Sequence, residues 1–147
     1  MTNNQSKIKK VLMIDDDKAM VELYQTAFSL RKEYQLIAAF TSQEGEKLAK
    51  QEKPDLILLD LVFPKEEGLL DEMGRPIKIR THAGYQLLKT LKQDPQTKNI
   101  PVVVLTNLPD KHEDEAKARM LGANDYLVKA KFLPRELIEK IDEILKE

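Results

Sequence analysis

The sequence predicts an α/β domain built on a doubly wound, five-stranded parallel sheet. Short apolar runs of strand length alternate along the chain with longer segments in which apolar residues recur at helical spacing. Two of these runs, at residues 11–14 and 56–59, lack polar alternation, as expected of strands that helices cover on both faces. Because strands and helices alternate strictly, we expect parallel strands joined by right-handed crossovers.

The composition limits the classes of function. The chain has 147 residues, with 24 Lys and Arg against 25 Asp and Glu, and no cysteine. The balanced charge leaves no basic field for nucleic acid, and the missing thiols exclude disulfides and thiolate metal sites. No apolar run reaches the roughly 20 residues of a membrane span, and the first residues lack the apolar core of a signal peptide. We therefore expect one cytoplasmic domain over residues 10–147, preceded by a flexible N-terminus over residues 1–9.

The first unit pairs the strand at residues 11–14 with a helix over residues 18–32, for which Asp17 is placed as the N-cap. The apolar positions of this helix keep helical spacing: Met20, Leu23, Ala27 and Leu30.

The second unit pairs a strand at residues 35–40 with a helix that begins in a capping box. Thr41 is placed to accept a hydrogen bond from the amide of Glu44, whose carboxylate reaches back. Pro54 ends this helix, and the third strand, at residues 56–59, follows at once.

The second half of the chain repeats the alternation. The expected elements, in order, are a helix from Gly84, a strand at residues 102–105, a helix at 113–121 that Gly122 closes, a strand at 125–129 and a helix from Pro134. The stretch between Gly68 and Gly84 is too long for a typical connection, and we interpret residues 69–80 as an inserted β-hairpin with its turn at Gly74.

Polar side chains stand at the carboxyl ends of four of the expected strands: Asp15 and Asp16, Asp60, Thr106, and Lys129. Because the carboxyl ends of parallel strands meet at one edge of a sheet, these side chains should converge. Carboxylates at such short range repel one another unless a cation lies among them, and hard cations prefer oxygen ligands. A metal site, a nucleophilic carboxylate, a hydroxyl and a fixed amine are the parts needed to move a phosphoryl group onto a carboxylate.

This set resembles the receiver domains of two-component response regulators, over residues 10–146 apart from the hairpin. The resemblance implies a single-domain, (βα)5 flavodoxin-like receiver fold. It also implies a phosphorylation-activated switch that takes a phosphoryl group on Asp60 from a histidine kinase or a histidine phosphotransfer protein of a phosphorelay. Catalysis would be limited to phosphorylating and dephosphorylating Asp60, so we expect a signalling module and not a metabolic enzyme.

The resemblance also implies roles for the residues at the strand ends. It assigns the following groups to Mg²⁺, with Mn²⁺ as an alternative: Asp15, Asp16, Asp60 and the backbone carbonyl of Val62. Thr106 and Lys129 would bind phosphoryl oxygens, and Tyr126 would be the aromatic residue that turns inward as Thr106 moves. Phosphorylation would remodel the face made by the last two helices and the strand at 125–129, where a downstream protein or a second copy binds.

Three features depart from the family pattern. Ala130 follows Lys129 where the family usually has proline, so a cis bond there lacks the help of proline, yet we expect the loop to deliver the Lys129 amine to Asp60. Asn107 replaces a small residue and is expected to narrow access to the phosphoryl group. Val62 and Leu108 are apolar where the family often has polar residues that place the attacking water, so we expect slow loss of the phosphoryl group.

Two alternatives stay open. A binding-only, receiver-like module would share the fold but typically lacks some of the five strand-end residues. A phosphatase of the haloacid dehalogenase type would also use an aspartyl nucleophile and Mg²⁺, but it carries a second aspartate two residues after the nucleophile, where this chain has Val62. The hairpin is either a tolerated insertion or a surface for partner or self-recognition.

Overall fold

The computed structural model describes residues 7–65, 70–75, 79–81, 83–107 and 111–146. Five parallel strands form one sheet in the order β2-β1-β3-β6-β7, which confirms the predicted fold class. The strands are β1 (Lys9–Ile14), β2 (Tyr34–Ala39), β3 (Leu56–Leu59), β6 (Val102–Thr106) and β7 (Asp125–Val128).

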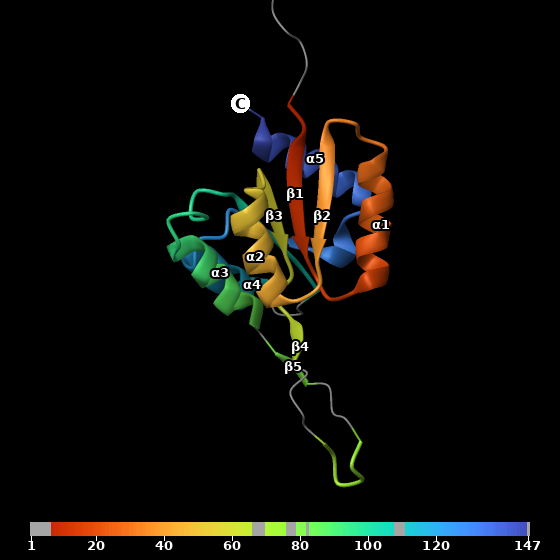
Figure 1. Cartoon of the computed structure of the whole chain (residues 1–147), viewed down its shortest axis with the longest axis vertical. Helices are drawn as coiled ribbons and strands as arrows, with labels where there is room; N and C mark the ends of the chain where they lie inside the picture. Colours follow the sequence, from red (N-terminus) through yellow and green to blue (C-terminus); the bar gives the residue numbers. More distant parts are fainter. Residues whose placement is uncertain (1–6, 66–69, 76–78, 82, 108–110, 147) are drawn as a thin grey trace, which may run out of the picture.

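Helices cover both faces of the sheet (Figure 1). One face packs on α1 (Lys18–Ser29) and α5 (Pro134–Leu145), and the other on α2 (Ser42–Glu52), α3 (Ala83–Gln93) and α4 (Lys111–Met120). None of the helices in the described part of the chain is both long and apolar enough to cross a membrane.

Alternation along each strand divides the core into two layers. In β1, Leu12 and Ile14 pack toward α2, α3 and α4, whereas Val11 and Met13 pack toward α1 and α5. All four side chains of β3 are buried, and they alternate between the two layers, with Ile57 and Leu59 in one and Leu56 and Leu58 in the other. The unbroken apolar runs in the sequence therefore reflect burial on both faces.

The expected helix ends are present. The Asp17 carboxylate accepts a hydrogen bond from the Met20 amide, and Thr41 Oγ1 accepts one from the Glu44 amide. Glu44 reaches back to the amide of Phe40, one residue before the cap. Gly122 follows α4 with a φ of +107°, a conformation that favours glycine.

Two local predictions need correction. The predicted apolar face of α1 is wrong in part: Leu23 and Leu30 are 52% and 80% exposed, and the fully buried side chains are Val21, Tyr24 and Phe28. Tyr24 and Phe28 are buried in place of the leucines because the larger aromatic side chains fill the core layer that α1 and α5 cover. In this layer the ring of Phe28 packs edge to face on the ring of Tyr34, with 5.6 Å between the ring centroids. The helix also ends at Ser29, earlier than residue 32.

The second correction concerns the N-terminal boundary. Lys9 and Lys10 belong to β1, so the expected flexible segment over residues 1–9 is too long at its end. The Lys9 amide donates to the Glu33 carbonyl, and the Asp55 amide donates to the Lys10 carbonyl, so neighbouring segments fix both residues. Residues 1–6 lie outside the described part of the chain.

A second, two-stranded sheet lies beyond the carboxyl end of the main sheet (Figure 1). Its antiparallel strands are β4 (Phe63–Lys65) and β5 (Ile79–Thr81). The expected turn is present: Gly74 has a φ of +78°, and the Asp71 carboxylate accepts hydrogen bonds from the amides of Met73 and Arg75. β4 lies before the predicted hairpin at 69–80, whereas β5 overlaps its last two residues. Residues 69 and 76–78 of the predicted hairpin lie outside the described residues.

Candidate functional site

Strand register brings the predicted site residues together. Ile14 of β1 is opposite Leu59 of β3, so the next residues, Asp15 and Asp60, leave neighbouring strands at the same height. On the far side of β3, the pairing of β6 with β7 ends at Thr106 opposite Val128, and Lys129 follows. The structure therefore forms the predicted cluster of strand-end residues at one edge of the sheet. We call this edge the rim, and its residues are Asp15, Asp16, Asp60, Thr106 and Lys129.

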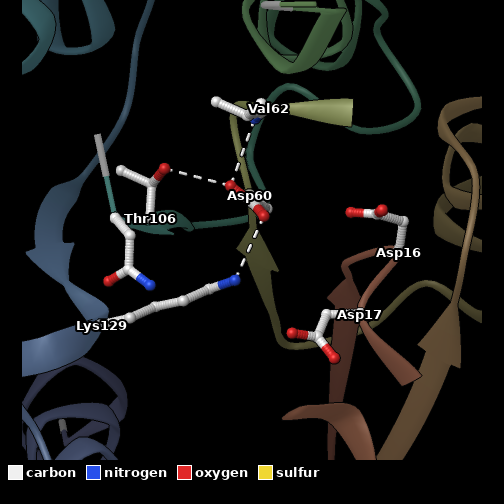
Figure 2. A pocket seen from close by; sticks show the side chains of 7 residues that line it. Asp16, Asp17, Asp60, Val62, Thr106 and Lys129 are labelled. Atoms are coloured by element: carbon white, nitrogen blue, oxygen red, sulfur yellow. Dashed lines mark hydrogen bonds and ion pairs between the residues drawn. The ribbon is translucent and has the colours of Figure 1, made fainter. Parts of the chain in front are cut away.

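Asp60 lies at the centre of this rim and is only 5% exposed. Its Oδ1 accepts hydrogen bonds from Thr106 Oγ1 at 3.1 Å and from the Val62 amide at 3.2 Å. Its Oδ2 is 3.1 Å from Lys129 Nζ, and Figure 2 shows the hydroxyl and the amine approaching from different sides of the carboxylate. Both oxygens of Asp60 thus accept from groups that stabilise negative charge.

Lys129 also contacts Asp15, with Nζ 2.6 Å from Oδ2, and both side chains are buried. Burial alone would lower the pKa of Lys129, but the carboxylates of Asp60 and Asp15 raise it overall, so the amine is held in its charged form. Within the described residues the peptide bonds are all trans, including the bond from Lys129 to Ala130. The alanine therefore does not prevent the lysine from reaching Asp60.

The carboxylates of Asp15, Asp16 and Asp60 form a cluster that suits a divalent cation. One oxygen from each lies within 4.8 Å of the others. Burial raises the pKa of Asp15, and the Asp60 carboxylate adds to that rise against the opposing effect of Lys129. Three hard oxygen donors with one nearby amine leave negative charge that a divalent cation would offset, so the residues fit Mg²⁺ or Mn²⁺.

A cavity of about 510 Å³ opens onto the cluster. Its lining residues are Asp16, Asp17, Asp60, Val62, Thr106, Asn107 and Lys129. Most of these were expected from the sequence, but Asp17 was assigned only as a helix cap. Asp15 is buried and does not line the cavity, and its Oδ1 accepts a hydrogen bond from the Asp17 amide at 2.9 Å.

Gly84 is a site residue that sequence reasoning treated only as the start of a helix. A Cβ at this position would lie 2.4 Å from the Asp60 carbonyl oxygen and 2.4 Å from Leu61 Cα. The Gly84 amide donates to the Leu61 carbonyl at 3.0 Å. Only glycine lets α3 begin against the backbone that carries Asp60. A glycine at the first turn of a helix was the available signal.

The remaining predicted residues differ in how the structure describes them. Tyr126 is 7% exposed and packs in the layer beneath α3 and α4. Asn107 is exposed, and its Oδ1 accepts a hydrogen bond from the Ala130 amide at 3.1 Å. Val62 lines the cavity and donates its amide to Asp60. Leu108 lies outside the described residues.

Comparisons with known proteins agree with this geometry. A family model for the response regulator receiver domain matches residues 11–74. Protein PilH of Pseudomonas aeruginosa is 33% identical over 121 residues, which are 82% of this chain and 84% of PilH. The chain belongs to the response regulator receiver domain family. The family assignment confirms the fold and the class of two-component signalling switch that the strand-end residues indicated.

Other relatives extend the receiver similarity. The alkaline phosphatase synthesis transcriptional regulatory protein PhoP of Bacillus subtilis is 34% identical over 138 residues, 94% of this chain. The chain spans about half the length of these regulators: 49% of PhoP and 48% of the probable transcriptional regulator ycf27 of Porphyridium aerugineum. Among solved structures, a putative response regulator from Chloroflexus aurantiacus has a TM-score of 0.70 and 28% identity, covering 96% of this chain and all of that one. The Mn²⁺-bound form of response regulator Rcp1 also has a TM-score of 0.70 and 28% identity, covering 94% of this chain and 95% of that one.

Proposed function

We propose that Asp60 of this receiver domain accepts the phosphoryl group of a two-component phosphorelay. The observation that supports the proposal most strongly is the environment of one carboxylate. Asp60 lies at an open cavity with the Thr106 hydroxyl on one oxygen, the Lys129 amine on the other, and two more carboxylates beside it. A structural aspartate at a strand end needs none of this.

In the transfer step, an Asp60 oxygen attacks the phosphorus atom of the donor. The new P–O bond forms as the bond from phosphorus to the donor breaks, and the electron pair of that bond leaves with the donor. With phosphohistidine the leaving group is an imidazole nitrogen, and with acetyl phosphate it is acetate. The Thr106 hydroxyl donates to one phosphoryl oxygen and the Lys129 amine pairs with another, which stabilises the charge that builds up on these oxygens.

The metal belongs to the same proposal. Asp15, Asp16, Asp60 and the backbone carbonyl of Val62 would hold Mg²⁺, or Mn²⁺ in its place. When bound, the cation supplies positive charge that offsets the carboxylates and the phosphoryl oxygens.

Family membership supports the proposed partners and output. The phosphoryl donor would be a histidine kinase or a histidine phosphotransfer protein, and a cytoplasmic location suits both. Movement of Thr106 toward the phosphoryl group, with Tyr126 responding, would change the face made by α4, β7 and α5. A downstream protein or a second copy of the chain would bind this face. The hairpin at residues 69–80 stays a candidate recognition element beside the same rim.

Loss of the phosphoryl group by hydrolysis would be slow. Val62, which lines the cavity, is apolar. The sequence places a second apolar residue, Leu108, two positions after Thr106. Neither can hold a water molecule in line with the phosphorus atom. We expect Leu108→Glu to accelerate decay of the adduct, and an unchanged decay rate would remove this part of the proposal. Val62 also weakens the phosphatase alternative, because that chemistry needs an acid or base at this position.

The test is the intact mass of the protein after incubation with Mg²⁺ and acetyl phosphate. We expect a single phosphoryl adduct on the wild type, none on Asp60→Asn, and slow decay after the donor is removed. A wild-type protein that binds Mg²⁺ and forms no adduct would favour the binding-only module.

A further inference from the structure

One peptide group beside the site is held at both of its polar ends. This is the peptide between Lys129 and Ala130, which begins a short 3₁₀ turn. Its carbonyl accepts a hydrogen bond from the Phe132 amide at 3.2 Å. Its N–H donates to Asn107 Oδ1 at 3.1 Å. The first bond lies within the turn, whereas the second comes from a different loop.

The bond from Asn107 extends the sheet beyond its last backbone pair. Parallel pairing of β6 with β7 ends at Thr106 opposite Val128. One residue farther along, the Asn107 side chain takes the place of a backbone carbonyl and binds the chain after β7. The residue that follows Thr106 is therefore hydrogen-bonded to the residue that follows Lys129. Thr106, at the end of β6, and Lys129, just after β7, both contact Asp60 with their side chains.

A lysine needs such support because its stem is long and flexible. Lys129 has to keep Nζ within 2.6 Å of Asp15 and 3.1 Å of Asp60 while the site stays open to the cavity. Fixing the peptide next to its Cα removes freedom at the base of the stem, where a small rotation moves the amine farthest. The N–H that Asn107 uses exists because residue 130 is alanine, since proline has none.

From these contacts we infer that Asn107 is a positioning residue for Lys129. Its side-chain oxygen fixes the peptide after the lysine, and so holds the amine where an Asp60-bound phosphoryl group would need it. This inference rests on the proposed function. It also opposes the expectation that Asn107 acts by narrowing access, because the two roles predict opposite effects of removing the side chain.

Two variants separate these roles. Asn107→Ala removes both the acceptor oxygen and the bulk, whereas Asn107→Leu keeps similar bulk and removes only the acceptor. If Asn107 positions Lys129, both variants take phosphate from acetyl phosphate roughly two- to tenfold more slowly, the range expected for one lost hydrogen bond. If Asn107 mainly limits access, the alanine variant becomes faster and the leucine variant stays close to wild type, which would overturn the inference.

Two measurements on the unphosphorylated protein test the same contact without relying on transfer. Hydrogen exchange of the Ala130 amide should be slow in the wild type and in Asn107→Asp, which keeps an acceptor oxygen, and faster in Asn107→Leu. NMR relaxation should show greater mobility of the Lys129 Cε in Asn107→Leu, with the thermal midpoint almost unchanged. Equal exchange and equal Lys129 mobility in the wild type and Asn107→Leu would overturn the inference. A wild type that forms no adduct would instead count against the proposed function.

Discussion

Leu59 and Asp60 are adjacent in the chain and both are buried, yet they belong to regions that differ in kind. Leu59 is the last residue of β3 and is completely enclosed by other apolar side chains. Asp60 begins the rim, where buried carboxylates and one buried lysine face a cavity. The sheet core therefore stabilises the fold, whereas the rim concentrates like charges that the fold has to tolerate. Removing a side chain from the core should therefore lower the free energy of unfolding, whereas removing a charge from the rim should raise it.

The largest effect is expected in the core. Leu58→Ala removes a side chain that is 1% exposed, and it should lower the free energy of unfolding by about 2–5 kcal/mol, because a cavity is left in a close-packed layer. Urea denaturation measures this change. Leu30→Ala is the matched control, because Leu30 is 80% exposed and should change stability by less than about 0.5 kcal/mol. Similar losses in both variants would mean that the core is not where stability resides.

Cation binding gives the next largest effect, and it acts on the rim. Mg²⁺ at about 100 times its dissociation constant should raise the free energy of unfolding by about 2.7 kcal/mol, because only the folded chain gathers the three carboxylates. Thermal unfolding over a Mg²⁺ titration measures the gain. Asp16→Asn should shift the titration to higher Mg²⁺ concentration. A midpoint that does not respond to Mg²⁺ would contradict the assignment of the cluster as a metal site.

A smaller effect, of opposite sign to the core change, is expected from Asp15→Asn without divalent cations. Burial and the Asp60 carboxylate disfavour the charged form of Asp15, and its pKa is raised. The neutral amide removes that penalty, and Lys129 keeps Asp60 as a partner. We expect a gain on the order of 1 kcal/mol, seen as a rise of roughly 2–4 °C in the thermal midpoint. A clear loss of stability would show that the Asp15 pair with Lys129 outweighs the repulsion.

The smallest expected effect is the pH dependence of that gain. A raised carboxyl pKa means that the folded state binds a proton more readily than the unfolded state. Protonation of Asp15 therefore stabilises the folded state below the ordinary pKa of 3.8, and this stabilisation is lost as pH rises through the folded pKa. The difference between Asp15→Asn and the wild type should therefore shrink on acidification toward pH 3.8. Chemical denaturation of both proteins at several pH values in EDTA measures it. A difference that grows on acidification would reverse the sign assigned to Asp15.

Much of the rim could be predicted from the sequence because parallel strands impose it. The buried strands show as unbroken apolar runs, and their register leaves no choice about where the next residue of each chain segment lies. The family resemblance then supplied roles that spacing alone does not give. Lys129 reaches Asp60 although alanine replaces the usual proline, and Lys129 is the first residue of a short 3₁₀ turn.

Other features could not be predicted because they depend on tertiary packing. Apolar residues near the first helix fit two adjacent faces, one with Leu23 and Leu30 and one with Tyr24 and Phe28. Only packing in the core layer shared with α5 determines that the second face is buried. The hydrogen bond from the Ala130 amide to the Asn107 side chain joins residues 23 apart in the chain, so no local sequence pattern predicts it. The strands that bracket the insertion include Pro64, which weakened the strand signal there.

The most direct test of the central claim is to find which carboxylate carries the phosphoryl group. Borohydride reduces an aspartyl phosphate to homoserine, which tandem mass spectrometry can place in the sequence. After phosphorylation of the wild-type protein with acetyl phosphate and Mg²⁺, we predict homoserine at position 60 and unmodified Asp15 and Asp16. Homoserine at position 15 or 16, with position 60 unmodified, would contradict the account, because the nucleophile would then be one of the carboxylates assigned to the metal.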